Sequence, residues 1–206
     1  MNILILGGTG RVGSQIIRYV LHDGHQVTLL VRTPEKVQQN HENVTIIQGN
    51  VLNQDDIVRA MHGMDVVISA LNTDGTTTLS ESMPFIIEAM ENEGIQRLIT
   101  VGTAGILQSR VTPDVLRYQS SESKRKSVRA AQEHHKVYDI LKQSKLDWTI
   151  VCPTYLPDGE AVGGYRTERN FLPEGGSKIS VGDTAEFAYS QIKDSHDIKT
   201  RVGLAY

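Results

Sequence analysis

The stretch NILILGGTGRVG, residues 2–13, decides the fold of this chain. It opens with an apolar run, Asn2 to Leu6, which is typical of a buried strand, and it continues into a glycine-rich turn. Apolar residues then recur at helical spacing from Val12 to His22. A strand, a glycine-rich turn and an amphipathic helix in direct succession predict a β-α unit that binds the diphosphate of a dinucleotide.

The glycine-rich turn fits both the G-x-G-x-x-G and the G-x-x-G-x-x-G spacing. Glycines let the backbone approach a diphosphate, while free N–H groups and the positive end of the helix dipole receive its charge. The candidate cofactor-binding residues here are Gly7, Thr9, Gly10, Arg11, Val12 and Gly13. Arg11 is the weaker candidate because its side chain can equally point to solvent. A turn that binds no ligand is the alternative for the whole stretch.

Short apolar runs and amphipathic stretches alternate along the rest of the chain. The further predicted strands are Gln26 to Val31, Val44 to Gln48, Asp65 to Ser69, Gln96 to Val101 and Asp147 to Val151. The further predicted helices are Gln54 to Met61, Leu79 to Glu93 and Ser127 to Gln143, with a weaker short one at Pro34 to Gln39. This alternation predicts an α/β fold of the Rossmann type, a doubly wound parallel sheet.

After Pro153 the pattern becomes irregular. A Gly-rich polar stretch, Asp158 to Gly176, precedes a predicted short strand at Lys178 to Ser180. We expect Asp183 to cap a last helix that runs to about Lys193, and Arg201 to Ala205 to form a final strand. The prediction is one domain, residues 1–206, in which residues 153–206 form the substrate side. The sequence leaves open whether residues 158–176 form an ordered wall or a mobile lid.

Composition limits the partners. A net charge of −3 offers no broad basic surface, so nucleic acid and membrane are poor candidates as primary partners. The basic run Lys124 to Lys126 lacks interleaved aromatic residues and is typical of a solvated helix start. No histidine spacing indicates a metal site. The single cysteine, Cys152, and the absence of a signal-peptide pattern favour a reduced, cytoplasmic compartment. The oligomeric state is left open.

The end of the second predicted strand indicates which nicotinamide cofactor binds. NAD-selective proteins carry an acidic residue there, which binds the adenosine ribose. This chain has Arg32 instead, and a guanidinium suits a 2′-phosphate. Thr33 and Lys36 stand close enough in sequence to add a hydroxyl and a second charge. The sequence therefore predicts NADP(H), with Arg32 as a solvated strand-end charge as the alternative.

Two further loops follow predicted strands at the edge where the cofactor would cross the sheet. Asn50 is a candidate to bond the adenine edge, and Val51 to pack against it. Ala70, Leu71 and Asn72 are small or polar residues at the exit of the fourth strand. An ordinary loop remains the alternative for both segments.

Together these residues resemble the atypical short-chain dehydrogenase/reductase family, in its NmrA-like and biliverdin-IXβ reductase/flavin reductase branch. Besides residues 7–13 and Arg32, the markers are residues 101–104, the stretch from His134 to Pro153, and residues 175–180 with Asp183 and Phe187. The resemblance covers nearly the whole chain and implies a Rossmann fold that binds NADP(H). Pro153 and Thr103 join the candidate cofactor-binding residues on this basis.

Typical members of the superfamily use a Ser or Thr with a Tyr-x-x-x-Lys pair. Thr103 stands where the Ser or Thr belongs, but the lysine position falls on His134 and the tyrosine position on Ala130. The string Tyr138 to Lys142 does match Tyr-x-x-x-Lys. However, its Lys142 lies about 12 Å along the helix from His134, too far to meet the nicotinamide. Surface and core packing is therefore the favoured interpretation of this string.

Without a tyrosine acid, the expected acceptors are conjugated molecules that take up hydride readily: flavins, quinones or tetrapyrroles. Thr103, Tyr155 and His134 are the candidate catalytic residues. The resemblance places Tyr155 in the substrate pocket, and an ordinary histidine pKa near 6.5 gives His134 both protonation states. Pocket or core packing is the alternative for all three. The alternative function is a non-catalytic NADP(H)-binding redox sensor of the NmrA-like type. An epimerase or dehydratase of nucleotide sugars is disfavoured because it needs the Tyr-Lys pair.

Overall fold

The computed structural model describes residues 1–73 and 75–206. The strands are β1 (Asn2–Leu6), β2 (Gln26–Val31), β3 (Val44–Gln48), β4 (Val66–Ser69), β5 (Arg97–Val101), β6 (Asp147–Pro153), β7 (Arg166–Arg169) and β8 (Thr200–Ala205). The helices are α1 (Arg11–His22), α2 (Gln54–Met61), α3 (Thr78–Asn92), α4 (Arg129–Gln143) and α5 (Val181–Ser190), with short 3-10 turns η1 (Pro34–Lys36), η2 (Ala104–Ile106) and η3 (Arg117–Gln119).

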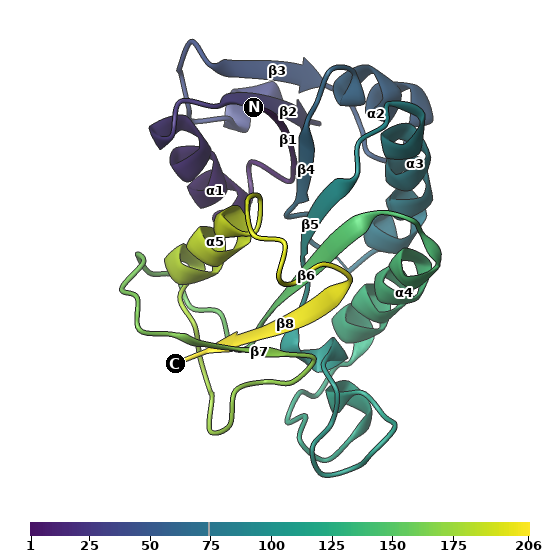
Figure 1. Cartoon of the computed structure of the whole chain (residues 1–206), viewed down its shortest axis with the longest axis vertical. Helices are drawn as coiled ribbons and strands as arrows, with labels where there is room; N and C mark the ends of the chain where they lie inside the picture. Colours follow the sequence, from purple (N-terminus) through teal and green to yellow (C-terminus); the bar gives the residue numbers. More distant parts are fainter. Residues whose placement is uncertain (74) are drawn as a thin grey trace.

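All eight strands join one sheet in the order β3-β2-β1-β4-β5-β6-β8-β7. Every neighbouring pair among the described residues is parallel except β7 and β8. Helices α1 and α5 cover one face of the sheet, while α2, α3 and α4 cover the other (Figure 1). The predicted doubly wound Rossmann fold is therefore confirmed, with one antiparallel strand added at the edge.

The central strand β1 explains why the sheet forms where it does. Ile3, Leu4, Ile5 and Leu6 are all fully buried, as expected for a strand covered on both faces. Ile3 and Ile5 pack into the core beneath α1 and α5, whereas Leu4 and Leu6 pack into the core beneath α2 and α3. Alternation of the side chains along one apolar run thus supplies both halves of the core.

The C-terminal part differs from the prediction. Strand β7 lies within residues 158–176, which the sequence left irregular, because its residues Arg-Thr-Glu-Arg are polar and an exposed edge strand needs no apolar run. It pairs with β8, from Arg166 opposite Ala205 to Arg169 opposite Val202. The predicted strand at Lys178 to Ser180 was wrong, because only Lys178 forms a bridge, to Tyr155.

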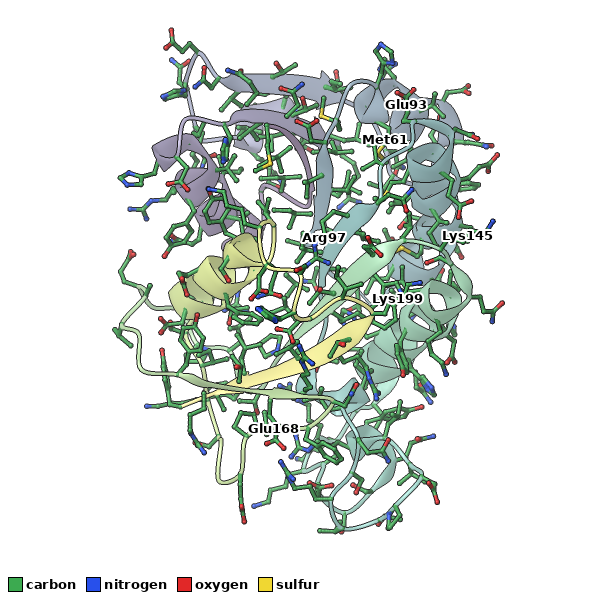
Figure 2. The ribbon with its side chains drawn as sticks, viewed as in Figure 1. Met61, Glu93, Arg97, Lys145, Glu168 and Lys199 are labelled. Atoms are coloured by element: carbon green, nitrogen blue, oxygen red, sulfur yellow. The ribbon has the colours of Figure 1, made fainter. Side chains whose placement is uncertain are left out.

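The start and end of α5 also differ from the prediction. Ser180, not Asp183, is the N-cap, because its hydroxyl accepts a hydrogen bond from the Asp183 backbone N–H at 3.0 Å. The helix ends at Ser190 rather than near Lys193. Arg97 at the start of β5 then donates to the carbonyl of Gln191, just beyond the helix, and Figure 2 shows this side chain pointing toward that turn.

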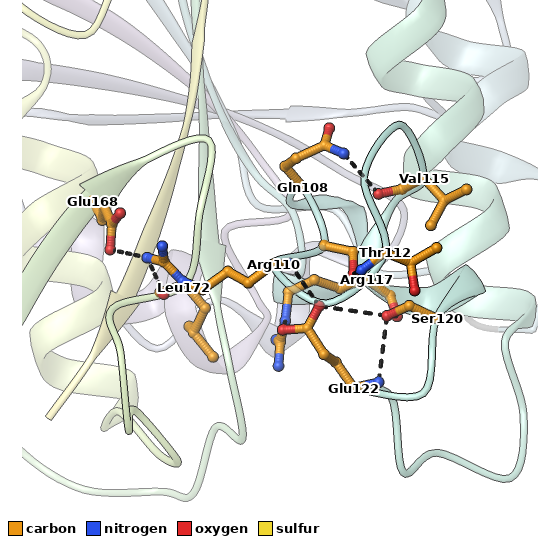
Figure 3. Close-up of polar contacts among 10 residues, drawn as sticks. Gln108, Arg110, Thr112, Val115, Arg117, Ser120, Glu122, Glu168 and Leu172 are labelled. Carbon is orange, nitrogen blue, oxygen red and sulfur yellow. Dashed lines mark hydrogen bonds and ion pairs between the residues drawn. The ribbon is translucent and has the colours of Figure 1, made fainter.

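The loop between β5 and α4 is held by its own polar contacts and by β7 (Figure 3). The carboxylate of Glu122 accepts hydrogen bonds from the Arg110 backbone N–H at 2.9 Å and from Arg117 Nε at 3.4 Å. Arg110 forms an ion pair with Glu168 of β7 and donates to the Leu172 carbonyl at 3.2 Å. This loop carries η3, which therefore has a defined position beside α4.

Candidate functional site

The glycine-rich turn is too tight to accept side chains. Gly7 has a φ of +80°, in the left-handed region that favours glycine, and its carbonyl accepts the Gly10 N–H at 2.9 Å. A Cβ built on Gly13 would lie 2.3 Å from the Gly7 oxygen, and one on Gly7 would lie 2.5 Å from the Ala70 oxygen. The turn thus packs directly against the exit of β4. Gly10 is the N-cap of α1, and as a glycine it has no side chain that could accept a hydrogen bond from the first N–H groups of the helix. An anionic ligand could accept those hydrogen bonds instead.

A cleft of about 260 Å³ opens beside this turn. It brings together many of the predicted residues: Gly7, Thr9, Gly10, Arg32, Asn50, Val51, Ala70, Leu71 and Asn72. It also includes residues that were not candidates: Leu30, Val31 and Thr78, together with Gly49 and Leu52 on either side of the predicted Asn50 and Val51. The strand ends β1, β2 and β4 thus converge on one cleft, as expected at the carboxyl edge of a parallel sheet.

Several predicted residues lie outside this cleft. Val12 and Gly13 are buried at the start of α1, where Gly13 packs beneath Gly7. Thr33 is the N-cap of η1. Arg11 lines a second hollow of about 210 Å³ on another side of the turn, together with Lys36. The structure therefore puts Arg32 in the first cleft and Lys36 in the second hollow.

Arg11 contacts the C-terminal segment. Its Nη1 lies 2.7 Å from Asp158 Oδ1 and donates to the Leu156 carbonyl at 3.1 Å. The side chain is therefore neither buried in the first cleft nor free in solvent. It joins the glycine-rich turn to the segment that follows β6.

Thr103, Pro153 and Tyr155 occupy the ends of β5 and β6. The Thr103 hydroxyl accepts the Gly105 N–H at 3.3 Å and so caps η2. Pro153 is buried as the last residue of β6. Tyr155 is 61% exposed, and its carbonyl accepts the Ile179 N–H at 2.9 Å. Tyr155 is therefore accessible to solvent, but it is not among the lining residues of the cleft beside the glycine-rich turn.

His134 has a different protonation state from the one expected. Burial lowers the pKa of His134 from 6.5 to about 4, and the nearby Glu133 carboxylate offsets this only in part. The imidazole is therefore neutral near pH 7. A lowered pKa disfavours the protonated form that the predicted role of His134 as a proton donor needs.

The Tyr-x-x-x-Lys string lies against the opposite end of the sheet. The Tyr138 ring packs on Trp148, with ring centroids 6.0 Å apart, and the Arg201 guanidinium lies 4.1 Å from its centroid. Lys142 Nζ lies over the same ring at 5.0 Å. Trp148 is near the amino end of β6, whereas the cleft is at the carboxyl edge. The contacts of Tyr138 with Trp148 and Arg201 therefore give this tyrosine a packing role.

The residues of the first cleft fit a nicotinamide dinucleotide. The turn excludes Cβ atoms where a diphosphate would approach, a helix without a side-chain cap begins there, and Arg32 directly follows β2. The described residues contain no group of three or more His, Cys, Asp or Glu positioned to hold a metal ion. No helix among them is long and apolar enough to cross a membrane.

Comparisons with known proteins agree with this geometry. The model of the NAD(P)H-binding family matches residues 7–195. The uncharacterized protein YwnB of Bacillus subtilis is 27% identical over 195 residues, which cover 90% of this chain and 89% of that protein. The photosystem II assembly factor Ycf39 of Synechocystis sp. is 32% identical over 106 residues, which cover 48% of this chain. The match spans only 32% of the length of Ycf39.

Among solved structures, a proposed NADH-flavin reductase from Streptococcus pneumoniae superimposes with a TM-score of 0.82 at 26% identity. The alignment covers 100% of this chain and 99% of that one. The similarity therefore extends over the C-terminal segment as well as the glycine-rich half.

Proposed function

Because this chain belongs to the NAD(P)H-binding family, we propose that it is an NADPH-dependent oxidoreductase that transfers hydride to a small conjugated acceptor, a flavin, a quinone or a tetrapyrrole. The observation that carries the proposal is the convergence of the glycine-rich turn, Arg32 and residues 70–72 on one cleft. The likeness to the proposed NADH-flavin reductase supports the choice of acceptor. A cytoplasmic location is part of the proposal, supported by the single buried cysteine.

In this proposal each part of the cleft has a separate task. The N–H groups at the start of α1 bind the diphosphate, and Arg32 binds the 2′-phosphate that distinguishes NADPH from NADH. Asn50 and Val51 contact the adenine. Residues 70–72 line the edge of the sheet where the cofactor crosses it, and the nicotinamide lies toward Thr103 and Pro153. When bound, NADPH supplies the hydride.

The choice of a conjugated acceptor follows from the lack of an acidic group at the positions where related enzymes carry a Tyr-Lys pair. The family resemblance puts Ala130 and His134 at the positions of the Tyr-Lys pair, and the lowered pKa of His134 disfavours its protonated form, so few groups there can protonate a simple ketone. A conjugated acceptor spreads the negative charge that hydride brings and needs less acid. Thr103 and Tyr155 would then orient its ring, and residues 153–206 would exclude water from the substrate side of the domain.

Steady-state NADPH oxidation tests this proposal. The purified protein is assayed with FMN, riboflavin, quinones and biliverdin, with NADH in parallel and with Arg32→Ala. We expect turnover with NADPH, and a loss of about tenfold to a hundredfold in kcat/KM for NADPH but not for NADH in the variant. Arg18→Ala is the matched control, because Arg18 is an exposed arginine of α1 that pairs with Gln15 and Glu160. Equal use of NADPH and NADH by the parent protein contradicts the assignment of Arg32.

A non-catalytic redox sensor is the second candidate. The similarity to Ycf39, which is named as an assembly factor, favours it, and so does the replacement of the Tyr-Lys pair that the family resemblance implies. In this case calorimetry detects NADPH binding, but no acceptor oxidises it. Binding of the sensor to its partner must then differ with and without cofactor, and equal binding would reject this second candidate.

A further inference from the structure

A third hollow, of about 490 Å³, lies between the starts of α3 and α4. Its lining residues are Thr77, Tyr118, Arg129, Gln132, Glu133, His135 and Lys136. They come from three separate parts of the chain, the N-cap of α3, the turn η3 and the first half of α4. The sequence interpretation assigned none of them to a site.

This hollow lies next to the cofactor cleft. Thr77 lines the hollow, and the adjacent Thr78 lines the cleft beside Asn72. Both α3 and α4 begin at the carboxyl edge of the sheet, because they follow β4 and β5. The hollow and the cleft therefore lie at the same edge of the sheet.

The walls of the hollow are held in place. The Tyr118 hydroxyl is 3.0 Å from His135 Nδ1, and His135 Nε2 lies 3.5 Å from Asp139. The loop that carries Tyr118 is fixed by the contacts of Glu122 and Arg110 described above (Figure 3). The hollow is thus formed before any ligand binds, which lowers the entropic cost of binding.

Glu133, the carboxylate among the lining residues, is already paired with a cation. Glu133 is buried, and it accepts hydrogen bonds from Ser80 Oγ at 2.8 Å and Lys136 Nζ at 2.7 Å. These contacts outweigh the effect of burial and keep the pKa of Glu133 below its ordinary value. Lys136 is therefore paired with Glu133, although the lysine side chain remains 57% exposed.

Arg129 is different. Its side chain is exposed and lines the hollow, and its guanidinium makes no hydrogen bond or ion pair with residues 1–73 and 75–206. The basic run Lys124 to Lys126 leads into the same end of α4, and the first turn of that helix carries no acidic residue. The one lining charge left unneutralised in the described structure is thus positive, in a preformed polar hollow beside the cofactor cleft.

We propose that this hollow binds the anionic group of the acceptor, a phosphate or a carboxylate, through Arg129. The inference rests on the reductase proposed above and narrows its acceptor class. It makes FMN a better ligand than riboflavin, because the two share the conjugated ring and differ in the phosphate. The ring would extend from the hollow toward Thr103 at the end of β5.

The test measures binding rather than turnover. Quenching of flavin fluorescence gives the Kd of FMN and of riboflavin for the protein saturated with NADP⁺. We expect FMN to bind about tenfold more tightly than riboflavin, and Arg129→Ala to remove that advantage without changing riboflavin binding. Arg125→Ala, which removes the same charge from the run before α4, should change either Kd less than twofold at 0.15 M salt.

The same comparison of Kd values, made with biliverdin and its dimethyl ester, tests whether the bound group is a carboxylate. A preference for the free acid that depends on Arg129, without any for FMN, would assign the group as a carboxylate. Equal binding of both pairs, or equal effects of Arg125→Ala and Arg129→Ala, would overturn the inference. If no acceptor oxidises NADPH, the reductase proposal fails, but the ratio of the two flavin Kd values still decides whether the hollow binds an anion.

Discussion

Arg11 and Asp158 form an ion pair in which Nη1 lies 2.7 Å from Oδ1. The arginine belongs to the glycine-rich turn, and the aspartate belongs to the segment after β6. Both side chains remain largely exposed, so the pair contributes less than about 1 kcal/mol to stability. Under the proposed function, a diphosphate bound at the turn would compete with Asp158 for the same guanidinium.

The first prediction concerns this competition. Asp158→Asn leaves Arg11 without its carboxylate, so we expect the Kd of NADPH to fall about two- to fivefold, which corresponds to at most about 1 kcal/mol. The gain should disappear in 0.5 M salt because both groups are exposed. Calorimetric titration at low and high salt measures it.

Glu160→Gln is the matched control for this experiment. Glu160 lies on the same segment but faces Arg18, at 3.9 Å, rather than the glycine-rich turn. Its replacement should leave the Kd of NADPH unchanged. If Asp158→Asn also leaves it unchanged, Arg11 does not contact the cofactor.

The sequence predicts the elements that are determined by their own residues, such as a run of apolar side chains or a fixed spacing of glycines. Strand β1 and the turn at Gly7 follow from a run of buried aliphatic residues and from spacing that only glycine satisfies. Strand β7 could not be predicted, because its polar residues acquire a strand conformation only from pairing with β8. Ser180 and Asp183 are both cap-type residues three positions apart, and the choice between them depends on where the helix begins.

The second prediction concerns the tightest contact of the turn. Gly13→Ala puts a Cβ 2.3 Å from the Gly7 oxygen, so the turn must open. We expect the free energy of unfolding to fall by about 2 kcal/mol and the affinity for NADPH to fall at least tenfold. Urea denaturation and calorimetry measure the two effects.

Gly63→Ala is the control for backbone strain alone. Gly63 has a φ of +73°, but a Cβ there would meet no heavy atom within 4 Å. We expect a loss of about 1 kcal/mol in stability and no change in NADPH binding. Loss of NADPH binding in both variants would show that the effect is not specific to the turn.

The third prediction concerns His134. Its pKa is about 4 in the folded protein against 6.5 when unfolded, so the fold favours the neutral form. This contribution to stability is complete above about pH 6.5 and is lost as the pH falls toward 4, by up to about 3 kcal/mol. His134→Gln should therefore show a flatter dependence of unfolding free energy on pH in this range. Urea denaturation at several pH values measures the difference.

His62→Gln provides the comparison, because His62 is an exposed histidine beside Glu93. Its replacement should leave the pH dependence of the parent protein in place. Identical slopes for the parent and His134→Gln between pH 4 and 6.5 would mean that the imidazole is not held neutral.

The residues of the candidate site could be predicted from the sequence where each one directly follows a recognisable strand. Arg32, Asn50 and Ala70 each follow a predicted strand, and parallel strands bring their carboxyl ends together. Leu30 and Thr78 were missed because the sequence does not show which side chain at a strand end or helix start faces the cleft. The hollow at Arg129 depends on the path of the loop that carries Tyr118, and that path is fixed by distant contacts such as Arg110 with Glu168.

The last prediction concerns Asp183, a buried carboxylate that joins the C-terminal elements. It accepts hydrogen bonds from the Gly163 N–H at 2.8 Å and the Ser180 hydroxyl at 2.9 Å, and also from Tyr206 and the Val162 N–H. Burial alone would raise the pKa of Asp183, but these bonds outweigh it and hold the pKa below the ordinary 3.8. The stability that they supply is therefore present above about pH 4 and is lost as the pH falls through the lower, folded-state pKa.

Asp183→Asn replaces an acceptor of several donors by a group that also donates, so we expect the free energy of unfolding at pH 7 to fall by about 3 kcal/mol. Tyr206→Phe removes the tyrosine's own hydrogen bond to the carboxylate and should cost about 1 kcal/mol. Urea denaturation from pH 7 to pH 3 measures both variants. The Asn variant should lose the part of the acid sensitivity that comes from this group, whereas the Phe variant should keep most of it. An Asn variant as stable as the parent at pH 7 would mean that the carboxylate does not hold residues 162 and 163 against α5.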